Sequence, residues 1–198
     1  MTVCFLVRHA AHDLLGRVLV GRQDALALSE AGHAQVGALV RRLAPLRITR
    51  IQSSPRDRAV QTAVPIAARS GLAVEVCDAL DEVDFGSWTG QRFSDLAPDP
   101  NWRRWNDERA QGVAPGGERM GDVQARIMAH LLEMHVQRPR ARIVMVSHAE
   151  VIRAVVLHVL AMSLNDWRAV DVAPGSITAV RILPHGCDLI GFEEAAAA

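Results

Sequence analysis

The chain contains 198 residues, 49% of them hydrophobic, and its 22 basic residues are balanced by 22 acidic ones. This length predicts a single compact domain that is large enough to bury its own core. A formal net charge of zero argues against nucleic acids and anionic membranes as partners, because both require an excess of basic residues. The sequence also contains no apolar run close to the roughly 20 residues that cross a bilayer.

Lysine is missing from the sequence, so every basic residue is an arginine. This excludes a phosphate-binding P-loop, Schiff-base chemistry and Ser-Lys catalysis, all of which need a lysine. The three cysteines, Cys4, Cys77 and Cys187, lie too far apart for a CxxC metal site, and their odd number does not suit a disulfide framework. Strand-like residues begin at Val3 without a charged leader, so we expect a cytoplasmic globular enzyme.

Short apolar runs alternate along the chain with stretches of helical spacing. In chain order the pattern predicts a strand at 3–7, a helix from a Ser29 cap to Leu43, a strand at 48–52, a helix that Ser54 and Pro55 open and Gly71 closes, a strand at 74–76, an amphipathic helix over 120–134, a strand at 143–146, a helix to Leu160, and strands at 177–183 and 189–192. Continuous apolar runs such as 3–7 are typical of strands buried on both faces. The alternation predicts a three-layer α/β/α fold with a mainly parallel central sheet.

Periodicity fades between residues 80 and 117, after the third predicted strand. Tryptophan, proline and glycine accumulate there, which predicts a small cap or lid inserted in a single domain over residues 1–198. Trp102 and Trp105 have helical spacing, which favours packing over a platform for the substrate. The last four residues, all alanine, are expected to be frayed.

Two of the predicted parallel strands are followed by histidine. Arg8 and His9 follow the first strand, and His148 follows the strand at 143–146. Ligands of such sheets bind beyond the carboxyl ends of the strands, so these groups predict an anion site, the alternative being unrelated loop histidines. Arg58 favours the anion site, because an arginine in the first turn of a helix is mildly unfavourable unless an anion is bound there. Simple solvation on the helix surface is the alternative for Arg58.

Five segments of the sequence occur in the order that a known family shows. The segments are Leu6-Val7-Arg8-His9-Ala10, residues 53–63 (SSPRDRAVQTA), residues 80–90 (LDEVDFGSWTG), Pro115-Gly116-Gly117-Glu118 and Val146-Ser147-His148-Ala149. Together they resemble the histidine phosphatase superfamily, which includes the phosphoglycerate mutases. An Arg-His pair alone is weak evidence, whereas five ordered segments spread from residue 3 to about residue 183 are strong evidence.

The resemblance implies a catalytic role for five residues. His9 is expected to attack phosphorus and form a phosphohistidine, which requires a neutral ring, and the nearby charges of Arg8 and Arg58 lower its pKa. Arg8, Arg58 and His148 are expected to bind the phosphoryl oxygens. Glu82 is expected to protonate the leaving oxygen and then to activate water, with a pKa raised by the adjacent phosphate. Neither a metal nor a cofactor is implied, because the arginines balance the phosphate charge.

The segment after His9 departs from the family pattern. The family continues with Gly-x-Thr-x-x-Asn, whereas this chain has His12 at the threonine position and Leu15 at the asparagine position. Loss of the asparagine removes a phosphate donor, for which Arg17 or Arg22 is expected to compensate. His12 is expected to line the pocket as a phosphate ligand or a substrate contact, the alternative being a solvent-exposed loop histidine.

Two alanines complete the predicted site. Ala10 replaces the glycine of the family motif, and its backbone N–H is expected to face the phosphate. Ala149 follows His148 in the last motif and is expected to line the substrate site.

The acid-bearing segment distinguishes between two activities of the family. The cofactor-dependent mutases have a longer insertion and a Glu-Arg-His-Tyr-Gly segment there, whereas this chain has residues 81–86 (DEVDFG) and no tyrosine. We therefore predict the phosphatase branch, acting on a small phosphorylated metabolite. Mutase-type phosphoryl transfer is one alternative, and a weakly active or inactive phosphatase that binds phosphorylated ligands is another. The sequence leaves open the substrate's identity and whether the protein is a homodimer.

Overall fold

The computed structural model describes residues 1–184 and 186–193, and the predicted frayed end at 195–198 lies outside these residues. The strands are β1 (Thr2–Arg8), β2 (Arg50–Ser53), β3 (Val74–Val76), β4 (Arg142–Ser147), β5 (Ile177–Leu183) and β6 (Gly186–Glu193). The helices are α1 (Glu30–Leu43), α2 (Asp57–Ser70), α3 (Phe93–Leu96), α4 (Pro100–Asp107), α5 (Met120–Gln137) and α6 (Ala149–Val159). Short 3₁₀ helices occupy Ala44–Leu46, Asp78–Leu80, Gly86–Trp88 and Leu164–Ala169.

The strands form one mixed sheet in the order β3-β2-β4-β1-β5-β6. Neighbours from β3 to β1 are parallel, whereas β5 is antiparallel to both β1 and β6. The predicted α/β fold with a mainly parallel sheet is therefore confirmed. The register pairs Arg8 at the end of β1 with Ser147 at the end of β4, so His9 and His148 leave the sheet side by side.

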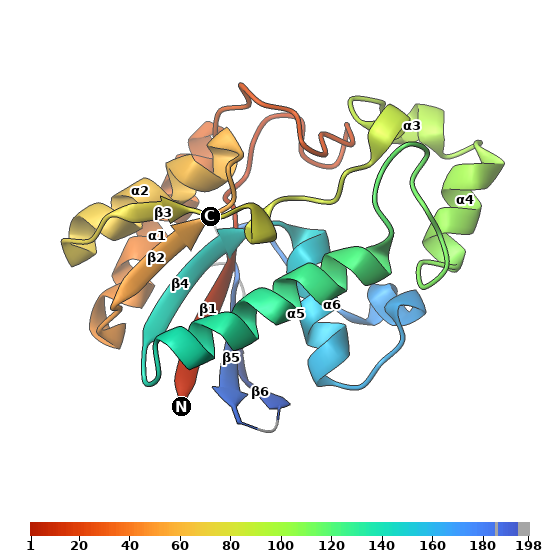
Figure 1. Ribbon diagram of the computed structural model, residues 1–198. Coiled ribbons are helices and arrows are strands. Elements are labelled where there is room, and N and C mark those ends of the chain that lie inside the picture. Colours follow the sequence, from red (N-terminus) through yellow and green to blue (C-terminus); the bar gives the residue numbers. More distant parts are fainter. Residues whose placement is uncertain (185, 194–198) are drawn as a thin grey trace.

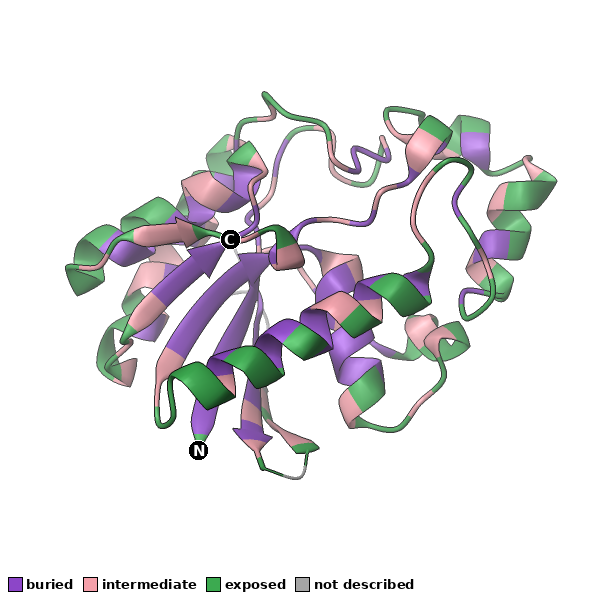
Figure 2. Ribbon diagram, viewed as in Figure 1, coloured by how far each residue is buried: buried purple, intermediate pink, exposed green. Residues whose placement is uncertain are grey.

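Helices cover both faces of the sheet and give the fold its three layers (Figure 1). Leu39 of α1 and Ile66 of α2 pack with Ile51 of β2 on one face. Ile127 of α5 and Val155 of α6 belong to the cluster on the other face. The strands are largely buried, while the outer sides of the helices are exposed (Figure 2). This burial on both faces explains the continuous apolar runs of β1 and β4.

The predicted start of helix α2 at Ser54 and Pro55 is wrong, although its predicted end is right. The helix begins at Asp57, with Arg56 in the capping position. The Ser54 hydroxyl accepts the backbone N–H of Arg56 at 3.3 Å and also contacts Asp81 and His148, which lie far away in sequence. These tertiary contacts hold Ser54 and Pro55 outside the helix, which starts two residues later. At the other end, Gly71 adopts the left-handed conformation, with a φ of 66°.

The cap segment, defined as residues 80–117, carries α3 and α4 and lies beside the sheet (Figure 1). Its tryptophans pack together: the ring centroids of Trp102 and Trp105 are 5.5 Å apart in a stacked arrangement, and Trp88 meets Trp102 edge-on at 5.3 Å. Trp105 is only 2% exposed, which confirms the packing interpretation for this residue. Trp102 is half-buried and also lines a cavity.

An ion-pair network joins the cap segment to the first turn of α6. The guanidinium of Arg109 lies between Trp105 and Trp167, with its central carbon 4.5 Å and 3.7 Å from the two ring centroids. It pairs with Glu150, which also pairs with Arg153 at 2.5 Å. Arg109 is 4% exposed, so its charge depends on Glu150 for compensation.

Replacement of Arg109 by leucine is expected to destabilise the protein. The substitution leaves Glu150 without one of its two partners and removes both ring contacts, so we expect the free energy of unfolding to fall by about 3 kcal/mol. Urea unfolding followed by circular dichroism measures this change. The control is Arg104→Leu, which removes an exposed i,i+4 pair with Glu108 and is expected to cost at most about 0.5 kcal/mol. Equal losses in the two variants would contradict the role of the network.

Candidate active site

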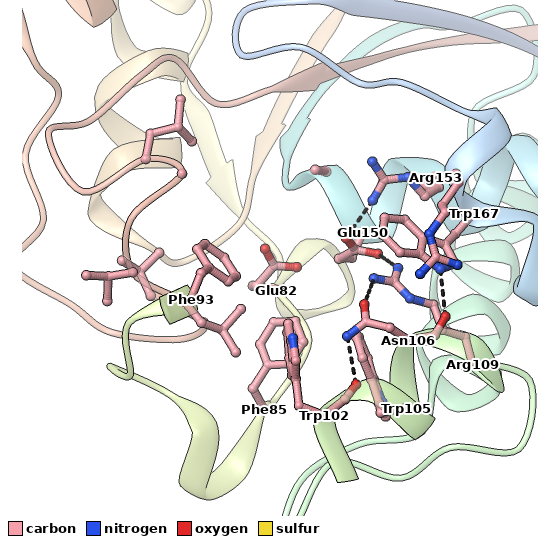
Figure 3. A pocket seen from close by; sticks show the side chains of 18 of the residues that line it. Glu82, Phe85, Phe93, Trp102, Trp105, Asn106, Arg109, Glu150, Arg153 and Trp167 are labelled. Carbon is pink, nitrogen blue, oxygen red and sulfur yellow. Dashed lines mark hydrogen bonds and ion pairs between the residues drawn. The ribbon is translucent and has the colours of Figure 1, made fainter. Parts of the chain in front are cut away.

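A cavity of about 880 Å³ lies at the carboxyl ends of β1 and β4. Its wall is built from the loop between β1 and α1, the cap segment, the start of α6 and the 3₁₀ helix Leu164–Ala169 (Figure 3). Ligands of parallel sheets bind in this position because crossover connections leave a crevice there. The predicted site residues that line the cavity are Arg8, His9, His12, Glu82 and Ala149.

Two further predicted residues lie behind His9 and are fully buried. The Nε of Arg58, in the first turn of α2, is 3.3 Å from Nε2 of His9. The ring centroid of His148 is 5.1 Å from that of His9. The fold therefore brings together groups from three segments that are separated by about 50 residues or more, around one imidazole ring.

The hydrogen bonds of His9 determine which ring nitrogen carries the proton. Nδ1 lies 2.8 Å from the carbonyl oxygen of Ala10, which can only accept, so Nδ1 is protonated and donates. Nε2 accepts from Arg58 and therefore holds a lone pair. Burial, reinforced by the charges of Arg58 and Arg8, holds the pKa of His9 well below its usual value. His9 is thus a neutral imidazole with its nucleophilic nitrogen next to an arginine.

Hydrogen bonds to both of its ring nitrogens hold His148 in place. Its Nδ1 is 3.2 Å from a terminal nitrogen of Arg58, and its Nε2 is 2.7 Å from the hydroxyl of Ser54. Because Arg58 can only donate, His148 carries its proton on Nε2 and donates to Ser54, which donates in turn to Asp81 at 3.2 Å. Both ring nitrogens are engaged within the protein, so binding of a phosphoryl oxygen by His148 stays a prediction.

Glu82, the predicted acid, places its carboxyl group at the cavity wall. Burial raises its pKa to about 7, against the opposing charge of Arg58. One carboxyl oxygen accepts the backbone N–H of Val83 at 3.0 Å, and the other lies 3.8 Å from Nδ1 of His148. The pKa rise expected from a bound phosphate is thus present without one, because the protein itself excludes water from this carboxyl.

Arg22 does not line the cavity and instead supports the segment that carries Glu82. Its Nε donates to the backbone carbonyl of Glu82 at 2.8 Å and lies 3.3 Å from Asp81. Its terminal nitrogen pairs with Glu118 at 2.8 Å. We call the segment that carries Glu82, residues 81–86, the acid loop. Arg22 contacts this loop in place of its predicted contact with phosphate, because carboxylates from two segments other than its own already surround its guanidinium.

The segment Pro115-Gly116-Gly117-Glu118 also supports the acid loop. Glu118 accepts the backbone N–H of Asp84 at 2.9 Å, and its own N–H donates to the carbonyl of Asp84 at 2.8 Å. A side chain at Gly117 would place its Cβ 2.1 Å from that carbonyl, so only glycine allows the two loops to approach this closely. This motif therefore acts at a distance from phosphate, through the position of Glu82.

Two buried nitrogens around His9 lack partners among the described residues. They are Nε of Arg8 and Nδ1 of His12, and both residues line the cavity. The ring of His12 stacks on that of His9 with centroids 5.5 Å apart, and burial lowers its pKa to about 4. Unsatisfied polar groups are costly when buried, so their presence at a cavity wall indicates a ligand with acceptor oxygens. The N–H of Ala10 is not available for this ligand, because it donates to Thr62 at 3.0 Å.

Ser54 and Asp81 are site residues to which the sequence assigns no role. Asp81 is 6% exposed and accepts hydrogen bonds from Ser54, from Arg56 at 2.9 Å and from the N–H of Glu82 at 2.8 Å. Both residues lie within the motifs quoted above: Asp81 immediately precedes Glu82, and Ser54 lies four residues before Arg58. Position beside a motif residue was the available signal, but only the folded chain reveals the partners.

No group of three or more His, Cys, Asp or Glu residues among residues 1–184 and 186–193 is arranged to hold a metal ion. Within the same residues, every helix is too short or too polar to cross a bilayer.

Comparison with known proteins gives a consistent assignment. The model of the histidine phosphatase superfamily, branch 1, matches residues 4–194. Phosphoserine phosphatase 1 of Hydrogenobacter thermophilus is 31% identical over 172 residues, which cover 84% of this chain and 80% of that protein. Glucosyl-3-phosphoglycerate phosphatase of Mycobacterium tuberculosis is 30% identical over 175 residues, which cover 83% of this chain and 78% of that protein.

A solved structure agrees with these relatives. Phosphoserine phosphatase of Entamoeba histolytica in complex with 3-phosphoglyceric acid has a TM-score of 0.84 and 27% identity, and the match covers 98% of both chains. The expectation of a phosphatase, which the acid-bearing segment favoured over a mutase, agrees with the names of these relatives. The chain belongs to the histidine phosphatase superfamily and is a phosphatase.

Proposed function

We propose that the protein hydrolyses phosphomonoesters of small metabolites through a phosphohistidine on His9, without a metal ion. The observation that carries this proposal is the state of the His9 ring: neutral, protonated on Nδ1, with a lone pair on Nε2. A nitrogen nucleophile needs this state, and a lone histidine in solution reaches it only part of the time near neutral pH.

The reaction divides into two displacements at phosphorus. In the first, Nε2 of His9 forms a bond to phosphorus, the bond to the ester oxygen breaks, and the Glu82 carboxyl gives its proton to that oxygen. In the second, the Glu82 carboxylate takes a proton from water, whose oxygen attacks phosphorus and breaks the N–P bond. Inorganic phosphate leaves, and both residues regain their initial states.

Charge on the transferred group is balanced by arginine. The free Nε of Arg8 supports a direct contact with a phosphoryl oxygen. Arg58 already donates to His9, His148 and the carbonyl of Gly21, so a phosphoryl contact from Arg58 requires it to exchange one of these partners. The unpaired Nδ1 of His12 offers one more nitrogen for a hydrogen bond at the same wall.

The names of the relatives suggest substrates to test first, namely phosphoserine and glucosyl-3-phosphoglycerate.

We also propose a cytoplasmic location, which the free Cys4, Cys77 and Cys187 support. A homodimer, which the sequence leaves open, is tested by light scattering on the same preparation.

The test of this function is hydrolysis of p-nitrophenyl phosphate in excess EDTA, combined with rapid quenching of enzyme mixed with labelled ester. We expect turnover to persist in EDTA and an acid-labile, alkali-stable label on the protein, as a phosphoramidate bond requires. Loss of turnover in EDTA would contradict metal independence. Tight phosphate binding without turnover would favour the alternative of an inactive phosphatase, and transfer of label to a second metabolite instead of water would favour a mutase.

A further inference from the structure

The cavity extends well beyond the groups that surround His9. Its volume of about 880 Å³ lies near the upper end of the roughly 300–1,000 Å³ of pockets that hold drug-sized ligands. The phosphoryl group itself needs only a small part of this space. The chemistry of the residues that line the remaining walls therefore indicates which kind of alcohol the enzyme releases.

Much of this remaining wall is apolar and aromatic. Figure 3 shows Phe85, Phe93 and Trp102 together on one side, near Glu82. We call the apolar lining the aromatic wall; it comprises Leu15, Val18, Phe85, Phe93, Trp102 and Trp105. Leu15, Phe93 and Trp102 are half-buried and face the cavity, so part of their apolar surface remains without a partner inside the fold.

The aromatic wall is held in place by its own packing. Phe93 contacts Trp102 at 6.2 Å between ring centroids, and Trp102 stacks on Trp105 at an interplanar angle of 17°. Phe85 meets Trp105 edge-on at 5.4 Å. Because these rings support one another, they lose little conformational entropy when a ligand packs on them. The apolar surface is therefore preorganised for binding.

The charged residues on the opposite wall bind one another. Figure 3 shows Arg109 and Arg153 both directed at Glu150, and Asp107 pairs with Arg168 at 3.2 Å. An ammonium group would find the Glu150 carboxylate already occupied by two guanidinium groups. Nε of Arg109 is the one guanidinium nitrogen of Arg109 that lacks a partner among the described residues. The carboxylates of this wall are already paired, so the wall offers little to a ligand that brings a positive charge.

We propose that the aromatic wall binds the leaving alcohol, and that the preferred substrates are phosphomonoesters whose alcohol carries an apolar group of ring size. This inference rests on the proposed function, because the phosphoryl group must lie at His9 for the alcohol to reach the wall. Leu15 contributes to the preference: it stands where the family pattern has asparagine, and it replaces a polar donor with apolar surface at the cavity.

The test compares two alkyl esters whose oxygens leave with similar ease, 2-phenylethyl phosphate and ethyl phosphate. We expect kcat/KM to be about 30-fold higher for the ring-bearing ester, because burial of a phenyl ring transfers a large apolar area out of water. The ratio is expected to fall severalfold in Phe93→Ala and in Leu15→Ala. Leu132→Ala, which truncates a 45% exposed residue of α5 outside the cavity, is the matched control and should keep the wild-type ratio. Circular dichroism melting confirms that each variant is folded.

Binding of phosphonates separates failure of this inference from failure of the proposed function. Wild-type protein is titrated calorimetrically with 2-phenylethylphosphonate and ethylphosphonate, which cannot be hydrolysed. If neither ester turns over but the ring-bearing phosphonate binds at least about tenfold tighter, the result supports binding of an apolar group by the aromatic wall and contradicts the proposed hydrolysis. Equal affinities, a kcat/KM ratio near one, or a higher kcat/KM for phosphoserine than for 2-phenylethyl phosphate would overturn the inference.

Discussion

His9→Ala is expected to lower kcat/KM for phosphomonoesters by about 10⁴-fold or more and to abolish the phosphoenzyme. The substitution removes the only protein atom that forms a bond to phosphorus in the proposed mechanism. Water would then have to attack the ester directly, without the lone pair that Ala10 and Arg58 orient on Nε2. Steady-state kinetics with p-nitrophenyl phosphate, together with acid- and alkali-quenched labelling, measures both effects.

The control for this variant is His33→Ala, which removes an exposed histidine of α1. It is expected to keep the wild-type kcat/KM and the phosphoenzyme. Inorganic phosphate should still protect folded His9→Ala against thermal unfolding, because Arg8 retains its unpaired Nε donor. Turnover by His9→Ala at a rate near that of the wild type would rule out covalent catalysis by this residue.

Glu82→Gln is expected to lower kcat/KM for alkyl phosphates by about 10³-fold, with a much smaller effect on p-nitrophenyl phosphate. An alkoxide is a poor leaving group and needs the proton of Glu82, whereas nitrophenolate leaves without one. Because kcat/KM reports only the steps up to the first irreversible one, it isolates formation of the phosphoenzyme. Equal losses for the two ester types would show that Glu82 does not act as the acid.

The pH dependence of wild-type kcat/KM for an alkyl phosphate provides a second measurement of Glu82. Its pKa of about 7 means that the carboxyl holds its proton below this pH and loses it above, so kcat/KM is expected to fall about tenfold per pH unit above pH 7. The pKa of His9 is lowered well below its usual value, so protonation of His9 does not lower kcat/KM between pH 6.5 and 7. In Glu82→Gln, kcat/KM should no longer fall above pH 7. The control is Glu108→Gln, which changes an exposed carboxylate of the cap segment and should keep the wild-type decrease.

The order of strands and helices was predictable from the sequence because local patterns determine it. Apolar runs marked β1 and β4, and helical spacing marked α5. The Ser29 cap of α1 and the left-handed Gly71 at the end of α2 also depend on a few neighbouring residues. Local patterns failed at the start of α2, where the Ser54 side chain is bound by Asp81 and His148 from other segments.

The candidate site was accessible from the sequence to the extent that its residues lie at strand ends and in motifs. His9 and His148 follow adjacent parallel strands, so the topology alone places them side by side. The place of Arg58 in the first turn of a predicted helix indicated an anion site, and the family motifs supplied Glu82, whose role periodicity could not indicate. The antiparallel addition of β5 and β6 carried no comparable signal, since strand direction depends on the path of the chain between strands.

The sequence by itself determined the family, the α/β architecture and the identity of the groups around His9, because these depend on short motifs and on local periodicity. Which partner each charged group meets depends on the folded chain. Arg22 contacts the acid loop instead of phosphate, and Arg109 joins the cap segment to α6. The donor that meets Nε2 of His9 and the raised pKa of Glu82 likewise come from a neighbour distant in sequence and from burial, respectively. Electrostatic interactions act through space, so they become defined when the chain has folded.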